Sequence, residues 1–95
     1  DGFEVWTSFS DPNSYAIAAQ LHEALRSLNY TSDREIRDQD EFPLHVLSFT
    51  QAPSVLLELG FITSSDDMEK LGDADFQQQL ACALGDALIR HFEQQ

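Results

Sequence analysis

Glu58 is the residue whose surroundings point most directly to chemistry. It is the only charged residue within residues 55–61, where every other position is apolar or glycine. A carboxylate in such surroundings loses solvation unless a cation, a metal or a hydrogen-bond donor compensates it. If the segment is a strand, Glu58 shares a face with Leu56, and Gly60 leaves room beside the carboxylate. Two interpretations stay open: a glutamate at the solvated end of an edge strand, or a functional residue, because sites collect at strand ends.

The three histidines are the other potential metal ligands or proton carriers. His22 and His91 fall in predicted helices, where we expect structural roles. His45 lies in an apolar run that predicts a strand near the same sheet edge as Glu58, so it is a candidate site residue. A metal site needs three or more well-placed ligands, and the sequence contains no HExxH motif, no CxxC motif and no glycine-rich phosphate loop. We therefore expect no metal ligand in this chain.

Arg34 and Arg37 form a basic pair within the acidic segment 33–38. Local ion pairs, each stabilising by less than about 1 kcal/mol, are one interpretation. The other is a loop that contacts an anionic group of a substrate, so we retain both arginines as candidate substrate-binding residues. The single cysteine, Cys82, has no neighbouring base or cation that would activate it, and we expect a small buried apolar residue.

Helices that could position these residues are predicted from capping residues and hydrophobic spacing. Residues 12–28 repeat apolar side chains every three or four positions, after an aspartate suited to the N-cap and a proline suited to the first helical position. Residues 64–71 begin with a serine cap, and residues 76–92 carry an apolar side chain at every fourth position. The two longer helices therefore each have an apolar face that can pack against a sheet.

The strands must come from three shorter segments. Residues 3–7 alternate apolar and polar side chains, and residues 44–49 and 54–61 are apolar runs rich in valine and leucine. Residues 29–41 are polar and predict a solvated, mobile connection. Strands alternating with helices predict an α/β fold with a mixed or parallel sheet and flanking helices. Three strands are few for this class, whose sheets usually hold about five or six.

Length and charge narrow the class of protein. Ninety-five residues are enough for one modest core, and a hydrophobic content of 42% argues against a disordered chain. The formal net charge of -12 repels phosphate backbones, so we expect no nucleic-acid partner. No run approaches the ~20 apolar residues of a membrane span. Because the sequence starts at Asp1 without a methionine, we expect a fragment of a longer protein or a processed product.

Several segments together resemble the C-terminal half of the zinc-dependent N-acetylmuramoyl-L-alanine amidases. They are residues 43–47, residues 52–62, which contain the most specific motif, Glu-Leu-Gly-Phe, and residues 64–71. Residues 2–7 are similar to the family strand that follows its last metal-binding histidine. Residues 33–37 resemble the family's Arg-Gly-hydrophobic-Lys loop, with Glu35 where glycine is usual and Arg37 in place of lysine.

The resemblance implies that residues 1–95 are the C-terminal part of a single amidase-like catalytic domain, with only that half of a three-layer α/β fold present. In the family, the glutamate matching Glu58 is catalytic and acts as general base on a zinc-bound water. The zinc is held by two histidines and a glutamate from segments that would precede Gly2. Zinc is therefore expected in the parent domain, with no ligand in this chain. His45 replaces a tyrosine of the family pattern and matches no ligand position.

The function that the resemblance implies is that of a bacterial peptidoglycan hydrolase of the cell envelope, periplasmic or secreted. Such an enzyme cleaves the amide bond between N-acetylmuramic acid and L-alanine. The chain alone is expected to be inactive, and its expected partners are peptidoglycan and either the missing N-terminal half or a second copy of itself. The alternative is a non-catalytic peptidoglycan-binding or regulatory module that has lost the zinc ligands.

Overall fold

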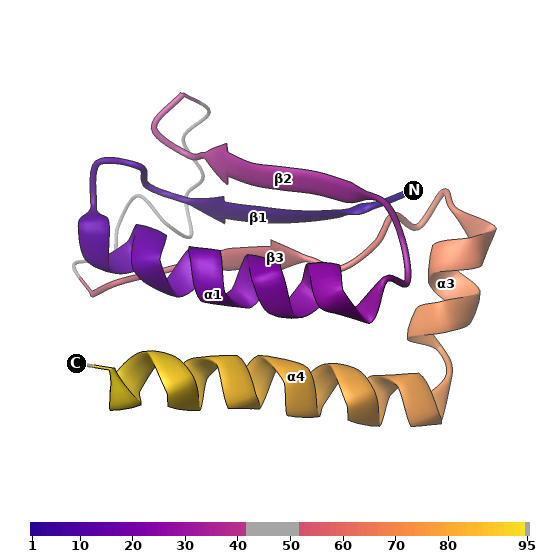
Figure 1. The fold of residues 1–95 in the computed structure, drawn as a ribbon. Coiled ribbons are helices and arrows are strands. Elements are labelled where there is room, and N and C mark those ends of the chain that lie inside the picture. Colours follow the sequence, from indigo (N-terminus) through magenta and orange to yellow (C-terminus); the bar gives the residue numbers. More distant parts are fainter. Residues whose placement is uncertain (42–51, 95) are drawn as a thin grey trace.

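The computed structural model describes residues 1–41 and 52–94, which form a three-stranded sheet with helices packed against it. In chain order the elements are β1 (Phe3–Thr7), α1 (Pro12–Leu28), β2 (Asp33–Asp38), β3 (Leu56–Glu58), α3 (Ser65–Leu71) and α4 (Ala74–Glu93) (Figure 1). β1 is the central strand, and it pairs in parallel with β2 and antiparallel with β3. The predicted α/β class with a mixed sheet is confirmed.

The helices begin at the capping residues that the sequence indicates. The Asp11 side chain accepts hydrogen bonds from two amides in the first turn of α1, and the Asp73 side chain does the same for α4. The Ser64 hydroxyl accepts from the amide of Asp67 at the start of α3. Such caps satisfy amides that have no partner within the helix. The predicted bounds of all three helices agree with the structure to within about two residues.

Residues 33–38 correct one expectation, because they form the edge strand β2 and not a solvated connection. Ile36 pairs with Val5 and packs against the core, whereas Arg37 pairs with Trp6 on the opposite face. An edge strand with one packed apolar side chain can otherwise be polar, and charged side chains also protect its open edge. Because β2 contains one apolar residue, Ile36, it lacks the apolar alternation from which strands are predicted.

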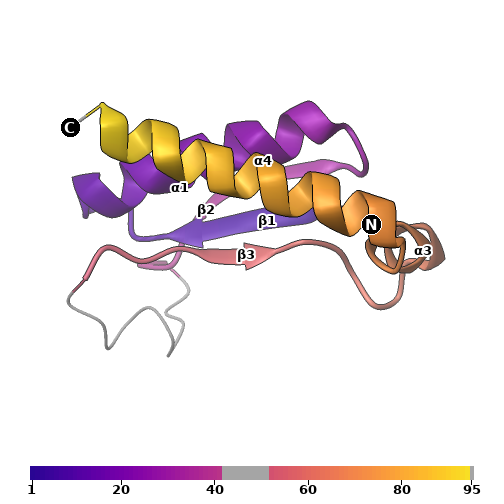
Figure 2. The ribbon, with the colours of Figure 1, turned by 90° about the horizontal axis from the view of Figure 1, so that it is seen from below.

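The core lies between the sheet and the two long helices. α1 and α4 run antiparallel beside each other on the same side of the sheet, while α3 lies beyond its end (Figures 1 and 2). In the part of the chain that the structure describes, no helix covers the opposite face. The main cluster of buried apolar side chains draws on β1 and on both long helices, and comprises Phe3, Val5, Ala18, Leu25, Phe76 and Leu80.

β3 is shorter than the predicted strand of residues 54–61. Beyond Glu58 the backbone makes hydrogen bonds with side chains. The Tyr30 hydroxyl donates to the Leu59 carbonyl at 2.6 Å, and the Phe61 amide donates to Asp67 at 3.0 Å. Burial, with a contribution from Asp67, raises the pKa of Tyr30 to about 12, so this hydroxyl remains a donor. The predicted strand at residues 44–49 and the candidate His45 lie outside the described residues.

α4 exposes a side chain that was expected to be buried. Its buried residues are Phe76, Leu80, Ala87 and His91, which recur at steps of four or seven. Cys82 lies about 200° around the helix from Leu80 and is exposed, so the expectation of a buried cysteine was wrong. Across residues 1–41 and 52–94, no helix has both the length and the apolarity to cross a membrane.

Candidate functional site

Glu58 lies on the face of the sheet that the long helices leave open. Leu57 packs on the core, so its neighbours in β3 point the other way, as the sequence predicts. The register of β1 and β3 places Glu4 directly opposite Glu58. Side chains of directly opposed residues project from the same face, with Cβ atoms about 5 Å apart. The structure therefore sets two carboxylates side by side.

Glu4 is the buried and fully bonded member of this pair, with 6% of its surface exposed. Its Oε1 accepts from the indole nitrogen of Trp6 at 3.0 Å, and its Oε2 accepts from Nε of Arg34 at 2.8 Å. Nε of Arg37 lies 3.3 Å from the same Oε2. Burial by itself would raise the pKa of Glu4, but the bonds from Arg34 and Trp6 and the charge of Arg37 together lower it. Glu4 is therefore an ionised group.

The pKa of Glu58 is shifted in the opposite direction, upward. Partial loss of hydration raises its pKa, and the adjacent charge and hydrogen bond of Glu4 raise it further against smaller opposing effects of Arg34 and Arg37. Neighbouring carboxylates whose pKa values are pushed apart are the usual arrangement for acid and base roles. A carboxylate with a raised pKa is a stronger base once it is ionised.

The two candidate substrate-binding arginines lie beside these carboxylates. Besides contacting Glu4, the Arg34 guanidinium stacks over the Phe61 ring at 5.0 Å, and Nε of Arg37 donates to the Arg34 carbonyl. Gly2 makes room for Arg34, because a Cβ at Gly2 would lie 2.5 Å from the Arg34 Cδ. The side chains of Arg34 and Arg37 are 42% and 40% exposed. Their contact with a substrate stays a prediction.

Glu4 is the residue that sequence reasoning missed. Alternation in residues 3–7 places it opposite Phe3 and Val5, which identifies a polar face and nothing more. Its two arginine partners lie about 30 residues away on β2, at positions that the sequence assigned to a loop.

Asp67 anchors the backbone around the candidate site. Its carboxylate, 2% exposed, accepts from the Gly2 amide, the Phe61 amide and the Thr31 hydroxyl at 3.0, 3.0 and 2.6 Å. It therefore ties the start of β1 to the segments next to β2 and β3. Gly60 allows Asp67 to lie close to the backbone after β3, because a Cβ at Gly60 would lie 3.0 Å from the Asp67 Cβ. Gly60 thus makes room for α3, where the sequence suggested room for Glu58.

A possible metal-binding group lies on the other side of the sheet. Among the described residues there is one such group, which consists of His22, Asp33 and Glu35. Their potential ligand atoms lie within 4.8 Å of one another. Nε2 of His22 is already 2.9 Å from Asp33, and its ring packs on the core residue Phe3. The zinc that the resemblance implies would act beside Glu58, and this group does not fit that place.

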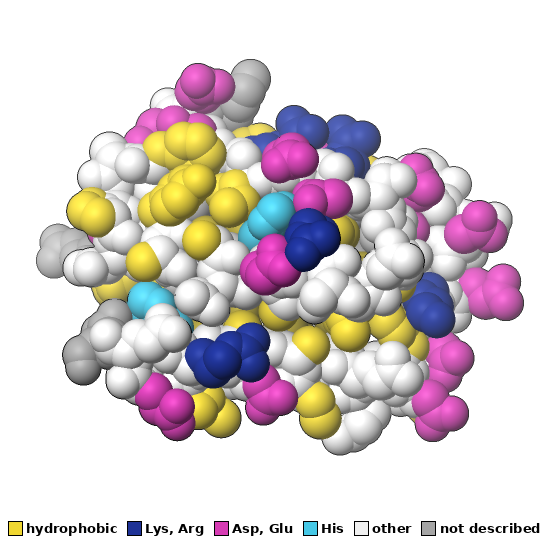
Figure 3. Space-filling view, in the orientation of Figure 1, with side chains coloured by type: hydrophobic (Ala, Val, Ile, Leu, Met, Phe, Trp, Pro, Cys, Tyr) yellow, Lys and Arg dark blue, Asp and Glu magenta, His cyan; other side chains and the backbone are white. Residues whose placement is uncertain are grey.

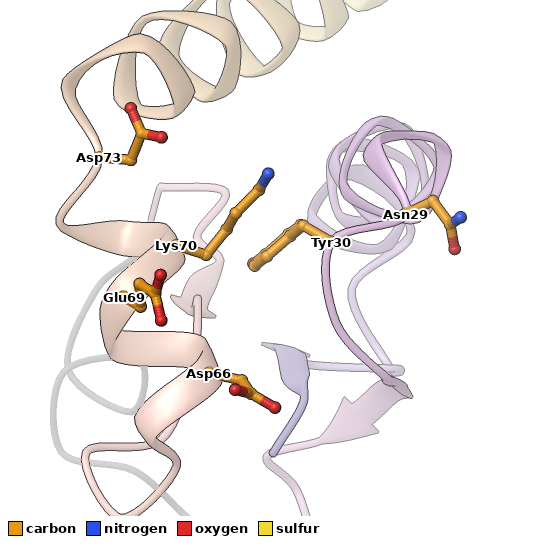
Figure 4. A pocket seen from close by; sticks show the side chains of 6 residues that line it. All are labelled: Asn29, Tyr30, Asp66, Glu69, Lys70 and Asp73. Atoms are coloured by element: carbon orange, nitrogen blue, oxygen red, sulfur yellow. The ribbon is translucent and has the colours of Figure 1, made fainter.

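A polar cavity of about 420 Å³ lies between α3 and the residues that follow α1 (Figure 4). Tyr30 and Lys70 point toward each other across it, whereas Asn29 points away. The Lys70 ammonium lies 5.0 Å from the centre of the Phe76 ring. Glu58 is not among the lining residues, so this cavity is separate from the candidate site.

Comparison with known proteins gives consistent results over nearly the whole chain. A family model described as N-acetylmuramoyl-L-alanine amidase matches residues 1–90. The uncharacterized protein YqiI of Bacillus subtilis is 35% identical over 88 residues, which is 93% of this chain and 41% of that protein. The N-acetylmuramoyl-L-alanine amidase LytC of the same organism is 29% identical over 86 residues, covering 90% of this chain and 17% of LytC.

The fold of this chain is also similar to a solved amidase structure. The catalytic domain of CwlV, an N-acetylmuramoyl-L-alanine amidase from Bacillus (Paenibacillus) polymyxa var. colistinus, has a TM-score of 0.83 to this chain at 28% identity. The match covers 97% of this chain and 49% of that structure. The chain thus spans less than half the length of the curated relatives and about half of the solved catalytic domain.

Proposed function

Because this chain belongs to the N-acetylmuramoyl-L-alanine amidase family, we propose that it is the C-terminal part of a single catalytic domain that hydrolyses peptidoglycan, with Glu58 as general base. The observation that carries the proposal is the position of Glu58 on the open sheet face, opposite an ionised Glu4, with a raised pKa. The amidase names of LytC and CwlV support hydrolysis over a non-catalytic wall-binding module.

The proposed reaction cleaves the amide bond between the lactyl group of N-acetylmuramic acid and L-alanine. Glu58 accepts a proton from the attacking water as its oxygen bonds to the carbonyl carbon. The C–N bond then breaks, and the proton passes from Glu58 to the departing amine. The carboxylic acid passes its remaining proton to the amine, so the products are a muramic acid carboxylate and a peptide with a protonated amino terminus, and atoms and charge balance.

Zinc is proposed for the parent domain, where it would activate the attacking water from ligands that the described residues do not contain. The family resemblance implies the metal, but beside Glu58 the described chain offers no set of ligands for it. The scheme for this chain therefore assigns roles to its own residues alone. Residues 1–95 on their own are expected to bind no stoichiometric zinc and to be inactive.

Arg34 and Arg37 are proposed to contact the substrate. Each uses Nε toward Glu4 or a backbone carbonyl, and a guanidinium carries further N–H donors that can bind a carboxylate. A peptide stem of peptidoglycan offers such carboxylates. Action on this substrate places the protein in the cell envelope.

The experiment that tests the proposal is Glu58→Gln in the full-length protein. The amide keeps the shape of the side chain but cannot accept a proton, so muropeptide hydrolysis should fall on the order of 100- to 10,000-fold with folding intact by circular dichroism. Glu69→Gln is the matched control, because it removes an exposed glutamate from α3. More than half of the activity remaining in Glu58→Gln would contradict the role of Glu58. A wild-type protein that binds peptidoglycan without hydrolysing it would support the non-catalytic alternative.

A further inference from the structure

We propose that Glu4 is a positioning residue, which holds Arg34 and Arg37 away from Glu58 and so leaves the Glu58 carboxylate free to accept a proton. The inference rests on the proposed role of Glu58 as general base. It adds a function for a buried carboxylate that has no part in the reaction scheme above.

The order of the strands puts Glu4 between the arginines and Glu58. β1 is central in the order β2-β1-β3, with both arginines on β2 and Glu58 on β3. Side chains that reach from β2 toward β3 over this face therefore meet Glu4 first. Both arginines do so, with Nε atoms 2.8 and 3.3 Å from the same oxygen of Glu4.

Burial makes Glu4 the stronger competitor for the two cations. Glu4 is 6% exposed and also accepts from Trp6, whereas Glu58 is exposed to water. Hydrogen bonds between charged groups strengthen as water is excluded. A guanidinium bound to Glu58 would instead compete with solvent and would stabilise its ionised form, making it a weaker base.

Among the residues that the structure describes, the charges acting on Glu58 come from Glu4 and the two arginines. They are the carboxylate of Glu4 from β1 and the guanidinium groups of Arg34 and Arg37 from β2. With Glu4 in place, its negative charge lies nearest and the arginines are neutralised. Without Glu4, a like charge beside Glu58 is lost, and Arg34 and Arg37 lose the carboxylate that holds them on the far side of β1.

The test is the pKa of Glu58 itself, measured by carbon-detected NMR titration in the full-length protein. In Glu4→Gln we expect the Glu58 pKa to fall by about one unit or more, because an opposite charge replaces a like charge. Glu4→Asp keeps the charge at a shorter reach and should give an intermediate value. Glu35→Gln removes the same charge from β2 without facing Glu58, so it should leave the Glu58 pKa unchanged.

An unchanged Glu58 pKa in folded Glu4→Gln would overturn the inference. Should that variant fail to fold, an unchanged pKa in Glu4→Asp would do the same. In the active protein, the acid limb of the kcat/KM pH profile should shift to lower pH together with the NMR pKa. This outcome is separate from the proposed function, because retained activity in Glu58→Gln would refute the general base while leaving the NMR result valid.

Discussion

Glu4, Glu58 and Asp67 carry the same functional group, and only their surroundings separate their roles. Glu4 and Asp67 are buried and accept three hydrogen bonds or ion pairs each. In both, burial opposes ionisation, but the donors outweigh it and lower the pKa. Glu58 is exposed beside another carboxylate and its pKa is raised. The first two therefore bind neighbouring segments of the fold, and the third is the carboxylate that we propose as the proton acceptor.

Asp67→Ala should destabilise the fold by about 3 kcal/mol, because it leaves the buried amide of Gly2 and the partly buried amide of Phe61 without an acceptor. Urea unfolding followed by circular dichroism measures the loss. The matched control is Asp66→Ala, which removes an exposed aspartate from the same turn of α3 and should cost less than about 1 kcal/mol. Equal losses in the two variants would show that Asp67 has no special structural role.

Acid should weaken the fold through Glu4 and Asp67. A carboxyl whose pKa is lower in the folded than in the unfolded state contributes stability above its unfolded pKa and loses it as pH falls through the folded value. Both pKa values are lowered, from 4.5 for Glu4 and 3.8 for Asp67, so the unfolding free energy should decrease as the pH falls below about 4.5. Urea titrations from pH 6 to pH 2 measure the slope, which should be shallower in Asp67→Asn. A stability that is flat over this range would contradict the assignment.

At the scale of elements, β2 is irregular where the family resemblance places a glycine. The register between β1 and β2 shifts between Phe3 and Val5, and Glu35 has φ of 73°. Left-handed backbone at a residue with a Cβ costs about 1–2 kcal/mol. The bulge turns Arg34 toward Glu4 while Ile36 returns to the core. Glycine would adopt this conformation without strain, and Glu35 adopts it with strain.

Glu35→Gly should therefore stabilise the protein by about 0.5–1 kcal/mol, since relief of strain exceeds the extra freedom that glycine gains in the unfolded chain. Thermal unfolding by differential scanning calorimetry measures the change in Tm. Glu35→Ala is the control, because alanine removes the same charge but keeps the Cβ. An equal gain in both variants would attribute the effect to charge and not to backbone conformation.

At the scale of the whole molecule, an acidic surface coexists with an incompletely covered sheet. Acidic side chains are spread around the face shown in Figure 3 and gather toward the α3 end. β2 and β3 are the two edges of the sheet in the described chain. Apolar side chains also face solvent, among them Ile62, Ile89 and Phe92. Charge repulsion thus opposes association that open edges and apolar patches favour.

Residues 1–95 should therefore associate more strongly as salt increases. Raising the salt concentration from 0.1 to 1 M shortens the Debye length from about 10 to about 3 Å and screens the net charge of -12. Light scattering should report a mass that rises with salt, and hydrogen exchange in β3 should be fast in dilute samples. A monomer at every salt concentration with slow exchange throughout the sheet would indicate that these residues need no partner.

The sequence by itself determined the helices and the face on which Glu58 lies. Caps such as Asp11 and Ser64 act on amides within the next three residues, and apolar spacing follows from the geometry of the same helix. The direction of Glu58 follows from alternation along its own strand. These are local properties, so the order of residues is sufficient to specify them.

Only the tertiary structure decided what surrounds Glu58. The strand β2 exists because β1 offers it a parallel partner through the α1 crossover, and its own residues show little strand pattern. The pairing of Glu4 with Glu58 depends on the register of strands that are far apart in the chain, and the same register brings Arg34 to Glu4. Strand pairing is a non-local interaction that a single sequence does not encode in its local pattern. The electrostatics of this candidate site therefore arise only when the sheet is assembled.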